Sequence, residues 1–227
     1  MTDPPIRQEA ELRVRKPRSD GERSRTAILR EAAQLATVEG IGGLSLGRLA
    51  DAVGMSKSGL YAHFGSKEEL QLATIETASA LFYEQVIEPA LRAPLGIERL
   101  HQLTENFLHV EGNVYPGGCF FASVAAEMDT HPGPVRDRAV QLIDDWLELL
   151  ASAVRDAQTE GAIDPSEDPD QLAFELEGFM LVGNAQFVIT KASRPIERTR
   201  TALRRRIAAA APVASAGAHV DAALGGT

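Results

Sequence analysis

The stretch LGRLADAVGMSKSGLYAHF, from Leu46 to Phe64, holds two short segments with apolar faces, separated by a glycine. Leu49 and Val53 share one face of the first segment at helical spacing. Gly54 falls between the segments, where a tight turn with positive φ carries no Cβ penalty for glycine. Leu60 is placed to anchor the second segment from the other side. This pattern is typical of a helix-turn-helix.

The second of these helices leaves a polar face uncovered. Hydroxyl and lysine side chains bind phosphate, lysine also reaches guanine edges, and glycine or alanine permits close approach in the major groove. The residues on this free face are Ser56, Lys57, Ser58, Gly59, Tyr61, Ala62 and His63. Their chemistry favours DNA binding, although an ordinary helical hairpin with a solvated face has the same apolar and glycine spacing.

Helix start and stop signals frame this stretch on both sides. From Arg23 to Glu39 apolar residues recur at helical spacing, and Gly40 ends the run. Ser45 and Ser56 are placed to cap the two short helices. The sequence Ser66-Lys-Glu-Glu69 forms a capping box that opens a long helix to about residue 90. A head of three helices is therefore expected, followed by a longer helix.

The rest of the chain reads as helices joined by loops. Further helical patterns cover about 97–111, 119–129, 134–160, 169–191 and 195–210. Asp168 followed by Pro169 is a cap residue with proline at the first helical position. The β-branched residues are too scattered to form a strand, so the sequence predicts an all-α fold.

Charge is divided unevenly along the chain. Residues 1–67 contain 11 lysines and arginines against 8 acidic residues, and residues 68–227 contain 12 against 24. The balances of +3 and −12 sum to the net charge of −9. A basic end on an acidic remainder indicates that one end meets a polyanion, and chance clustering is the alternative. With one cysteine and no long apolar run, the composition fits a cytoplasmic protein.

The run TAILREAAQLATVEGIGGLSLGRLADAVGMSKSGLYAHFGSKEEL resembles the N-terminal domain of the TetR (tetracycline repressor) family of bacterial regulators. The resemblance extends through residues 22–70 and keeps the order of landmarks. These are the helix ending at Gly40, Ser45 at the start of the second helix, Ala50, Gly54, and then LYAHF and SKEEL. Farther along, GCFFASVAAEMDTHPGPVRDR is similar to the ligand domains of some members.

The resemblance implies that the helix from Ser56 to Phe64 is the recognition helix. It also implies that Lys67 contacts phosphate from the start of the next helix, where the ammonium adds to the positive end of the helix dipole. Ser45 is placed to bind phosphate in the same way. The candidate DNA-binding residues are Arg25, Ser45, Arg48, Ser56, Lys57, Ser58, Gly59, Tyr61, His63 and Lys67.

The resemblance further implies a homodimer joined by a four-helix bundle from the last two helices of each subunit. The segment 169–191 is apolar on two faces, and such a helix needs two partners. A fully internal helix of a monomer is the alternative. The candidate interface residues are Leu172, Leu176, Phe179, Gly183, Ile196, Leu203 and Ile207.

The ligand site implied by the resemblance lies inside the helical part, between the helices at 97–160 and 169–191. The candidate lining residues are Phe107, Phe120, Phe121, Met128, Trp146, Met180, Asn184 and Phe187. An aromatic or methionine residue at helical spacing is more often plain core, whereas the buried amide of Asn184 needs a partner. Glu127, Glu175 or Glu177 could neutralise a cationic ligand if it points inward.

Together these observations predict four segments. They are a flexible basic arm (1–18), a helix-turn-helix DNA-binding domain (19–66), a helical ligand-binding and dimerisation domain (67–211) and a disordered tail (212–227). The expected function is a regulator of transcription, most simply a repressor released from a palindromic operator by a small molecule. A DNA-binding regulator controlled by a protein partner, without a pocket, is the alternative.

Catalysis is not expected from this sequence. It has no phosphate-binding glycine loop, no Gly-x-Ser-x-Gly elbow and no arrangement suited to a catalytic triad. The histidines lack metal-ligand spacing, so neither a metal nor a cofactor is predicted. Cys119 has no partner cysteine, and the sequence alone does not assign it a sensing role.

Overall fold

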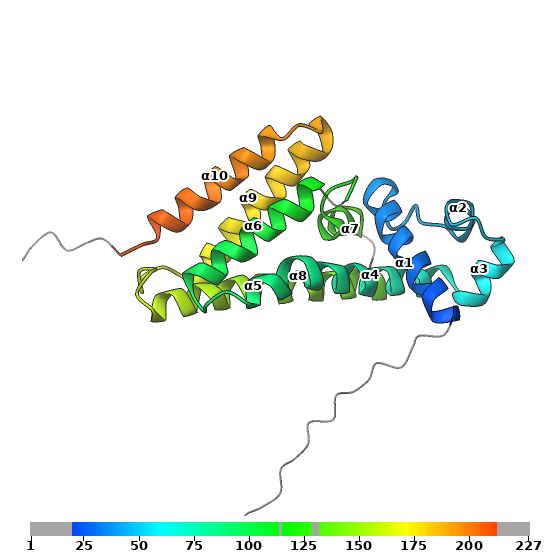
Figure 1. Ribbon diagram of the computed structural model, residues 1–227, viewed down its shortest axis with the longest axis horizontal. Helices are drawn as coiled ribbons and strands as arrows, with labels where there is room; N and C mark the ends of the chain where they lie inside the picture. The colour runs from blue at the N-terminus through cyan, green and yellow to red at the C-terminus, as the bar shows by residue number, and fades with distance from the viewer. Residues whose placement is uncertain (1–19, 114, 129–131, 213–227) are drawn as a thin grey trace, which may run out of the picture.

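The computed structural model describes residues 20–113, 115–128 and 132–212, and within these ranges the chain forms helices and turns without a strand. The all-α prediction is therefore confirmed. The predicted arm and nearly all of the predicted tail lie outside the described residues. Figure 1 shows an elongated molecule in which the head, α1 to α3, forms one end and the body, from α4 onward, forms the rest.

The head consists of α1 (Asp20–Glu39), α2 (Leu46–Ala52) and α3 (Lys57–His63). Ser45 Oγ accepts a hydrogen bond from the backbone N–H of Arg48, and Ser56 Oγ accepts one from Gly59. Gly54 has a φ of +65° in the turn between α2 and α3. Leu49, Ala50 and Leu60 are fully buried between the helices. The predicted caps, turn and anchor are all present.

A long helix leads from the head into the body. It comprises α4 (Lys67–Phe82), a π-helical turn (Tyr83–Ile87) and α5 (Glu88–Leu91). Ser66 Oγ accepts from the N–H of Glu69, and Glu69 Oε2 accepts from Gly65 N, one residue earlier than the capping box predicts. The sequence did not predict the π turn, a feature that is frequent at functional sites.

The body is completed by five helices whose bounds agree closely with the predicted segments. They are α6 (Ile97–Asn113), α7 (Phe120–Met128), α8 (Pro134–Thr159), α9 (Pro169–Thr190) and α10 (Arg194–Ala209). The Asp168 carboxylate caps α9 by accepting from two backbone N–H groups, as the Asp-Pro signal predicts. The long helix α8 packs against α4, α6, α7 and α9, and α10 packs mainly against α9.

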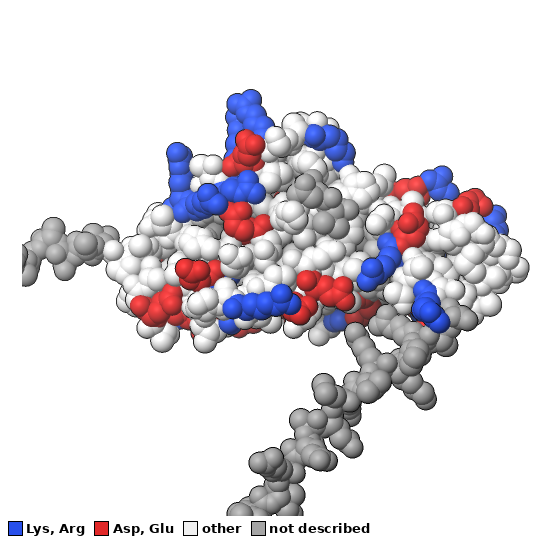
Figure 2. Space-filling view, viewed as in Figure 1, with Lys and Arg blue, Asp and Glu red and all other residues white. Residues whose placement is uncertain are grey.

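Ion pairs fix α10 to the body around its apolar stripe. Arg206 pairs with Glu167, in the loop before α9, and with Glu175 of α9. Arg200 and Arg204 both pair with Glu105 of α6 at 2.8 Å. Figure 2 shows the positive side chains gathered over α10, whose outward face is rich in arginine. The apolar stripe of α10 is consequently turned toward its own subunit.

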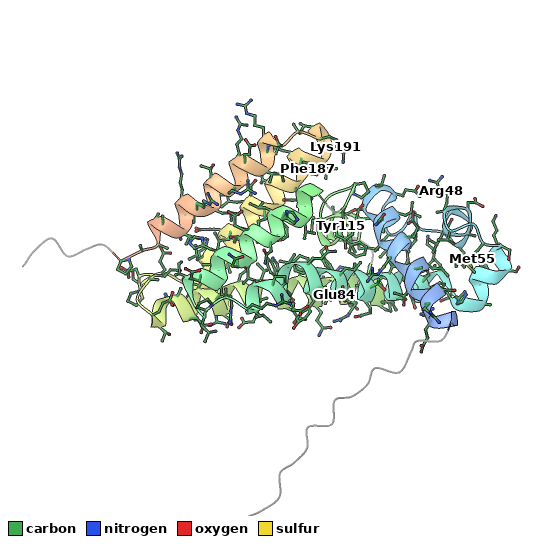
Figure 3. The ribbon with its side chains drawn as sticks, in the orientation of Figure 1. Arg48, Met55, Glu84, Tyr115, Phe187 and Lys191 are labelled. Atoms are coloured by element: carbon green, nitrogen blue, oxygen red, sulfur yellow. The ribbon has the colours of Figure 1, made fainter. Side chains whose placement is uncertain are left out.

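The loop of residues 115–119, between α6 and α7, joins the head to α9. Gly117 N donates to Thr37 Oγ1 of α1 at 3.1 Å, and Cys119 N donates to Asn184 Oδ1 of α9 at 2.9 Å. Lys191 Nζ, just after α9, donates to Pro116 O at 2.5 Å. A Cβ built on Gly117 would overlap the backbone carbonyl of Thr37, so the two backbones touch directly. Figure 3 shows Tyr115 of this loop in the middle of the molecule.

The turn between α1 and α2 is held by two helices of the body. Glu127 Oε1, near the end of α7, accepts from Gly42 N at 2.8 Å. From α4, Gln71 Nε2 donates to Ile41 O at 2.8 Å and Lys67 Nζ donates to Gly42 O at 2.5 Å. The head is therefore attached through α7 as well as through the long helix α4.

Candidate DNA-binding face and internal cavity

The outer face of α3 carries the polar residues that the sequence singled out. Leu60 points inward and is fully buried, whereas Tyr61 on the next position is 56% exposed. Ser56, Lys57 and Ser58 are also exposed, while Gly59 and His63 are half-buried. Hydroxyl and ammonium groups thus lie together at the tip of the molecule, where a major groove could receive them.

The other candidates for DNA binding have partners inside the head. Arg25 Nη1 donates to His63 O at 2.6 Å, and its guanidinium lies 4.3 Å from the centre of the Phe64 ring. Arg48 forms an ion pair with Glu39. These contacts fix α1 against the end of α3 and against α2. Arg25 and Arg48 thus have a structural role here, and their contact with DNA stays a prediction.

Inside the body lies a cavity of about 510 Å³. Its wall comes from α4 and the π turn, from α6, α7, α8 and α9. Several aromatic rings face it, and they pack edge to face: the Phe82 and Trp146 rings are 5.1 Å apart and the Phe82 and Phe121 rings 5.8 Å. Its wall includes Tyr83 and Phe174, which are 47% and 65% exposed, so the cavity extends to the protein surface.

A second, smaller cavity of about 20 Å³ adjoins the first. The residues Phe82, Phe107, Cys119 and Phe121 line both, so they form the wall between them. Glu111 lines the small cavity. Its side chain is 1% exposed and neither carboxyl oxygen has a hydrogen-bond partner among the described residues. A buried polar group without a partner costs free energy, so it calls for an explanation.

Two acidic groups at these cavities, Glu111 and Glu177, have raised pKa values. Burial, together with the smaller effect of the nearby Glu177 carboxylate, raises the pKa of Glu111 to about 8. Burial also raises the pKa of Glu177, against the effect of Trp146 Nε1, which donates to Glu177 Oε2 at 2.8 Å. Burial raises the pKa of the Cys119 thiol to about 12. Cys119 is therefore protonated at neutral pH, and a thiol in that form is a poor nucleophile.

The structure divides the predicted ligand-lining residues into two groups. Phe107, Phe121 and Trp146 line the large cavity, and Phe120 lines the small one with two of them. The other four residues line neither cavity. Met180 is fully buried in the core, and Met128 packs near the head, where its Cε lies beside Gly42.

Asn184 and Phe187 are two of the residues that line neither cavity. Each of them contacts another residue of the protein instead. The Asn184 amide accepts from Cys119 N, which supplies the partner that the sequence argument required. The Lys191 ammonium lies over the Phe187 ring, 5.6 Å from the ring centroid, and Figure 3 labels both residues at the end of α9. Of the three glutamates considered for charge neutralisation, Glu177 lines the large cavity. Glu175 pairs with Arg206, and Glu127 binds Gly42 N.

The predicted dimer residues need a correction. Six of the seven are buried within the subunit itself, since α9 and α10 pack their apolar stripes on each other and on the body. These six are Leu172, Leu176, Gly183, Ile196, Leu203 and Ile207. The seventh, Phe179, is 37% exposed, and it is joined on α9 by Val182 at 58% and Ile189 at 83%.

Within the part of the chain that the structure describes, only α9 is long and apolar enough to cross a membrane.

Sequence reasoning missed Glu111 and Phe82. Glu111 continues the buried stripe of α6, because it follows Leu100, Thr104 and Phe107 at spacings of three and four residues. An acidic residue within the apolar stripe of a helix is visible in the sequence, and it could have identified Glu111 as a candidate site residue. Phe82 lies on α4, which was outside the helices expected to enclose the ligand. Among the described residues no cluster of potential metal ligands is present.

Three helices, a capped turn and an exposed polar recognition helix on an α-helical body define a helix-turn-helix DNA-binding regulator of transcription. Two family models match the chain. Residues 28–74 match the model for bacterial regulatory proteins of the tetR family, and residues 96–203 match the tetracyclin repressor-like C-terminal domain. The chain belongs to the TetR family of transcriptional regulators.

Solved structures agree with this assignment. A TetR transcriptional regulator from Chloroflexus aurantiacus J-10-FL is 27% identical, with a TM-score of 0.76 over 82% of this chain and 95% of that one. AibR, in complex with isovaleryl coenzyme A and operator DNA, is 26% identical, with a TM-score of 0.63 over 79% and 95%. A regulator from Cytophaga hutchinsonii is 19% identical, with a TM-score of 0.74 over 86% and 98%, and shows the fold alone. Among the curated proteins, none is significantly similar.

Proposed function

We propose that this protein is a homodimeric repressor that binds a palindromic operator and leaves it when a small molecule occupies the body. It acts without catalysis, in the cytoplasm. The observation that carries the proposal is the pairing of an exposed polar recognition helix with a large cavity in one chain. In this arrangement α3 reads the DNA, and the domain of residues 67–211 receives the effector and forms the dimer.

The cavity favours a small-molecule effector over the alternative of control by a protein partner. A body built only to present a surface would pack its core to ordinary density. Here a space of about 510 Å³ is lined mainly by apolar and aromatic side chains with a few polar groups, which is typical of ligand sites. AibR, which is 26% identical, was solved with both an acyl coenzyme A and operator DNA, and it lends support to a regulator that binds both.

The exposed apolar stripe of α9 favours a dimer. Phe179, Val182 and Ile189 recur at helical spacing on a face that its own subunit leaves uncovered. A second copy of α9 related by twofold symmetry would cover that stripe with the same residues. Two heads on one dimer then match the two half-sites of a palindrome.

Sequencing the genomic DNA fragments that the protein retains tests the proposal and identifies the operator. On that operator, Lys57→Ala should relax the preference at one base step by about 1–3 kcal/mol, if Lys57 reads a guanine. The matched control is Arg92→Ala, which removes one exposed positive charge at the C-cap of α5, a helix of the body that lies away from the head. Retention of random fragments only, or equal operator affinity in Lys57→Ala and wild type, would contradict the proposal.

A further inference from the structure

The buried carboxyl of Glu111 is the least explained group in the molecule. It lies in the apolar stripe of α6, is 1% exposed, and leaves both oxygens without a partner among the described residues. Leucine in the same place would fill the stripe without that cost. The carboxyl lines the small cavity, so a hydrogen-bond or ion-pair partner for it must lie in that cavity.

In the described part of the chain, the two cavities are lined by acidic side chains and by no basic ones. Among the described lining residues, the carboxyl groups belong to Glu111, Asp145 and Glu177, and no lysine, arginine or histidine is present. Glu177 is close enough to Glu111 for its charge to raise the pKa of the Glu111 carboxyl. Such a lining repels carboxylates and phosphates, and it attracts a cation.

The wall between the cavities suits an organic cation. The rings of Phe82 and Phe107 in this wall and of Trp146 in the large cavity have centroids within 6.2 Å of one another, and aromatic faces attract positive charge. The small cavity, at about 20 Å³, has room for about one water-sized group. A primary ammonium group is of that size, whereas a trimethylammonium group is several times larger.

We propose that the adjoining cavities form a binding site for a hydrophobic primary amine, with the ammonium group at Glu111 and Glu177 and the apolar body in the large cavity. This inference rests on the proposed function only in treating the cavity as the effector site. The ammonium satisfies the two oxygens of Glu111, and Phe82, Phe107 and Phe121 enclose the first carbon atoms.

Proton release accompanies binding of the amine. At neutral pH the carboxyl of Glu111 is mostly protonated in the empty protein, and the arriving ammonium favours its ionised form. One proton then passes from Glu111 to the buffer for each amine bound. The other titratable groups nearby are Glu177 on α9, Cys119 and Tyr115 in the loop before α7, and Asp145 at the large cavity. Cys119 and Tyr115 stay protonated near neutral pH because burial raises both pKa values.

Calorimetric titration of the full-length protein with 4-phenylbutylamine, 4-phenylbutanol and 4-phenylbutyrate tests the proposal without DNA. The amine should bind about tenfold or more tightly than the alcohol, and the carboxylate should bind least. Buffers with different ionisation enthalpies should reveal about one proton released per amine at neutral pH and none for the alcohol. The 4-phenylbutyl trimethylammonium ion should bind more weakly than the primary amine.

Variants on one helix isolate the carboxyl. Glu111→Gln should abolish both the preference for the amine and the proton release, while Glu98→Gln, an exposed change on the same helix α6, should leave both intact. Equal affinity for amine and alcohol in the wild type, or an amine preference that survives Glu111→Gln, would overturn the proposal. The wild-type comparison stands even if Glu111→Gln fails to fold. Amine binding that leaves operator affinity unchanged would sink the proposed function but retain this site.

Discussion

The head and the body place their polar side chains in opposite ways. In the head, the hydroxyl and ammonium groups of α3 stand in solvent on a helix that is fixed by the Ser56 cap and the buried side chain of Leu60. In the body, the carboxyl groups of Glu111 and Glu177 are enclosed among aromatic rings. An exposed polar group costs little free energy and can contact a large partner such as DNA. A buried polar group costs free energy unless it is paired, and only a ligand small enough to enter the cavity can pair with it.

The largest effect should follow from breaking the contact between two bodies. Val182→Glu places a charge in the exposed apolar stripe of α9, so the dimer should dissociate and operator affinity should fall by about 100- to 10,000-fold through lost avidity. Sedimentation at micromolar concentration and a filter-binding titration measure the two effects. Leu95→Glu, at an equally exposed apolar residue outside α9, should change neither. A Val182→Glu protein that remains a dimer with full affinity would exclude this stripe as the interface.

The second prediction compares neighbouring residues of α3. Leu60→Ala removes a fully buried side chain and should lower the free energy of unfolding by about 2–5 kcal/mol. Tyr61→Ala should leave stability within about 0.5 kcal/mol, because Tyr61 is exposed, and should weaken binding to all DNA sequences. Urea unfolding followed by circular dichroism measures the first effect. Equal stability losses in the two variants would contradict the inward and outward assignment of α3.

The third prediction concerns pH and the body. The carboxyl of Glu111 has a pKa of about 8 in the folded protein against an ordinary value of 4.5. Between these values the unfolded chain binds fewer protons than the folded one, so stability falls as pH rises through this window. The slope from Glu111 is at most about 1.4 kcal/mol per pH unit. Urea unfolding at several pH values should show that Glu111→Gln removes this slope, and an unchanged slope would mean that Glu111 ionises normally.

The smallest effect is expected at the joint between head and long helix. Lys67→Ala should weaken operator binding modestly at all sequences and reduce the salt dependence by about one phosphate contact. The ammonium now donates to Gly42 O, so the same change should also loosen the turn between α1 and α2. Operator titrations over a salt series measure the slope. A slope identical to that of the wild type would assign Lys67 to the turn alone.

The same contrast explains what the sequence could predict. Caps, the turn glycine and the anchor of α3 are local signals, read from residues a few positions apart, and the structure has them all. The cavity depends on which helices meet, so the contribution of Phe82 and the partner of Asn184 could not be read locally. For α9 the sequence indicated two apolar faces, and only its packing with α10 determines which one is left exposed.

Gly117 gives the joint between head and body a marker that can be read in other sequences. The loop and α1 meet backbone against backbone there, so any side chain at this position would have to push the two apart. A member of the family with alanine or a larger residue at the equivalent position should therefore seat its head at a different distance from its body. The residue at this one position would then separate members that share this geometry from members that do not.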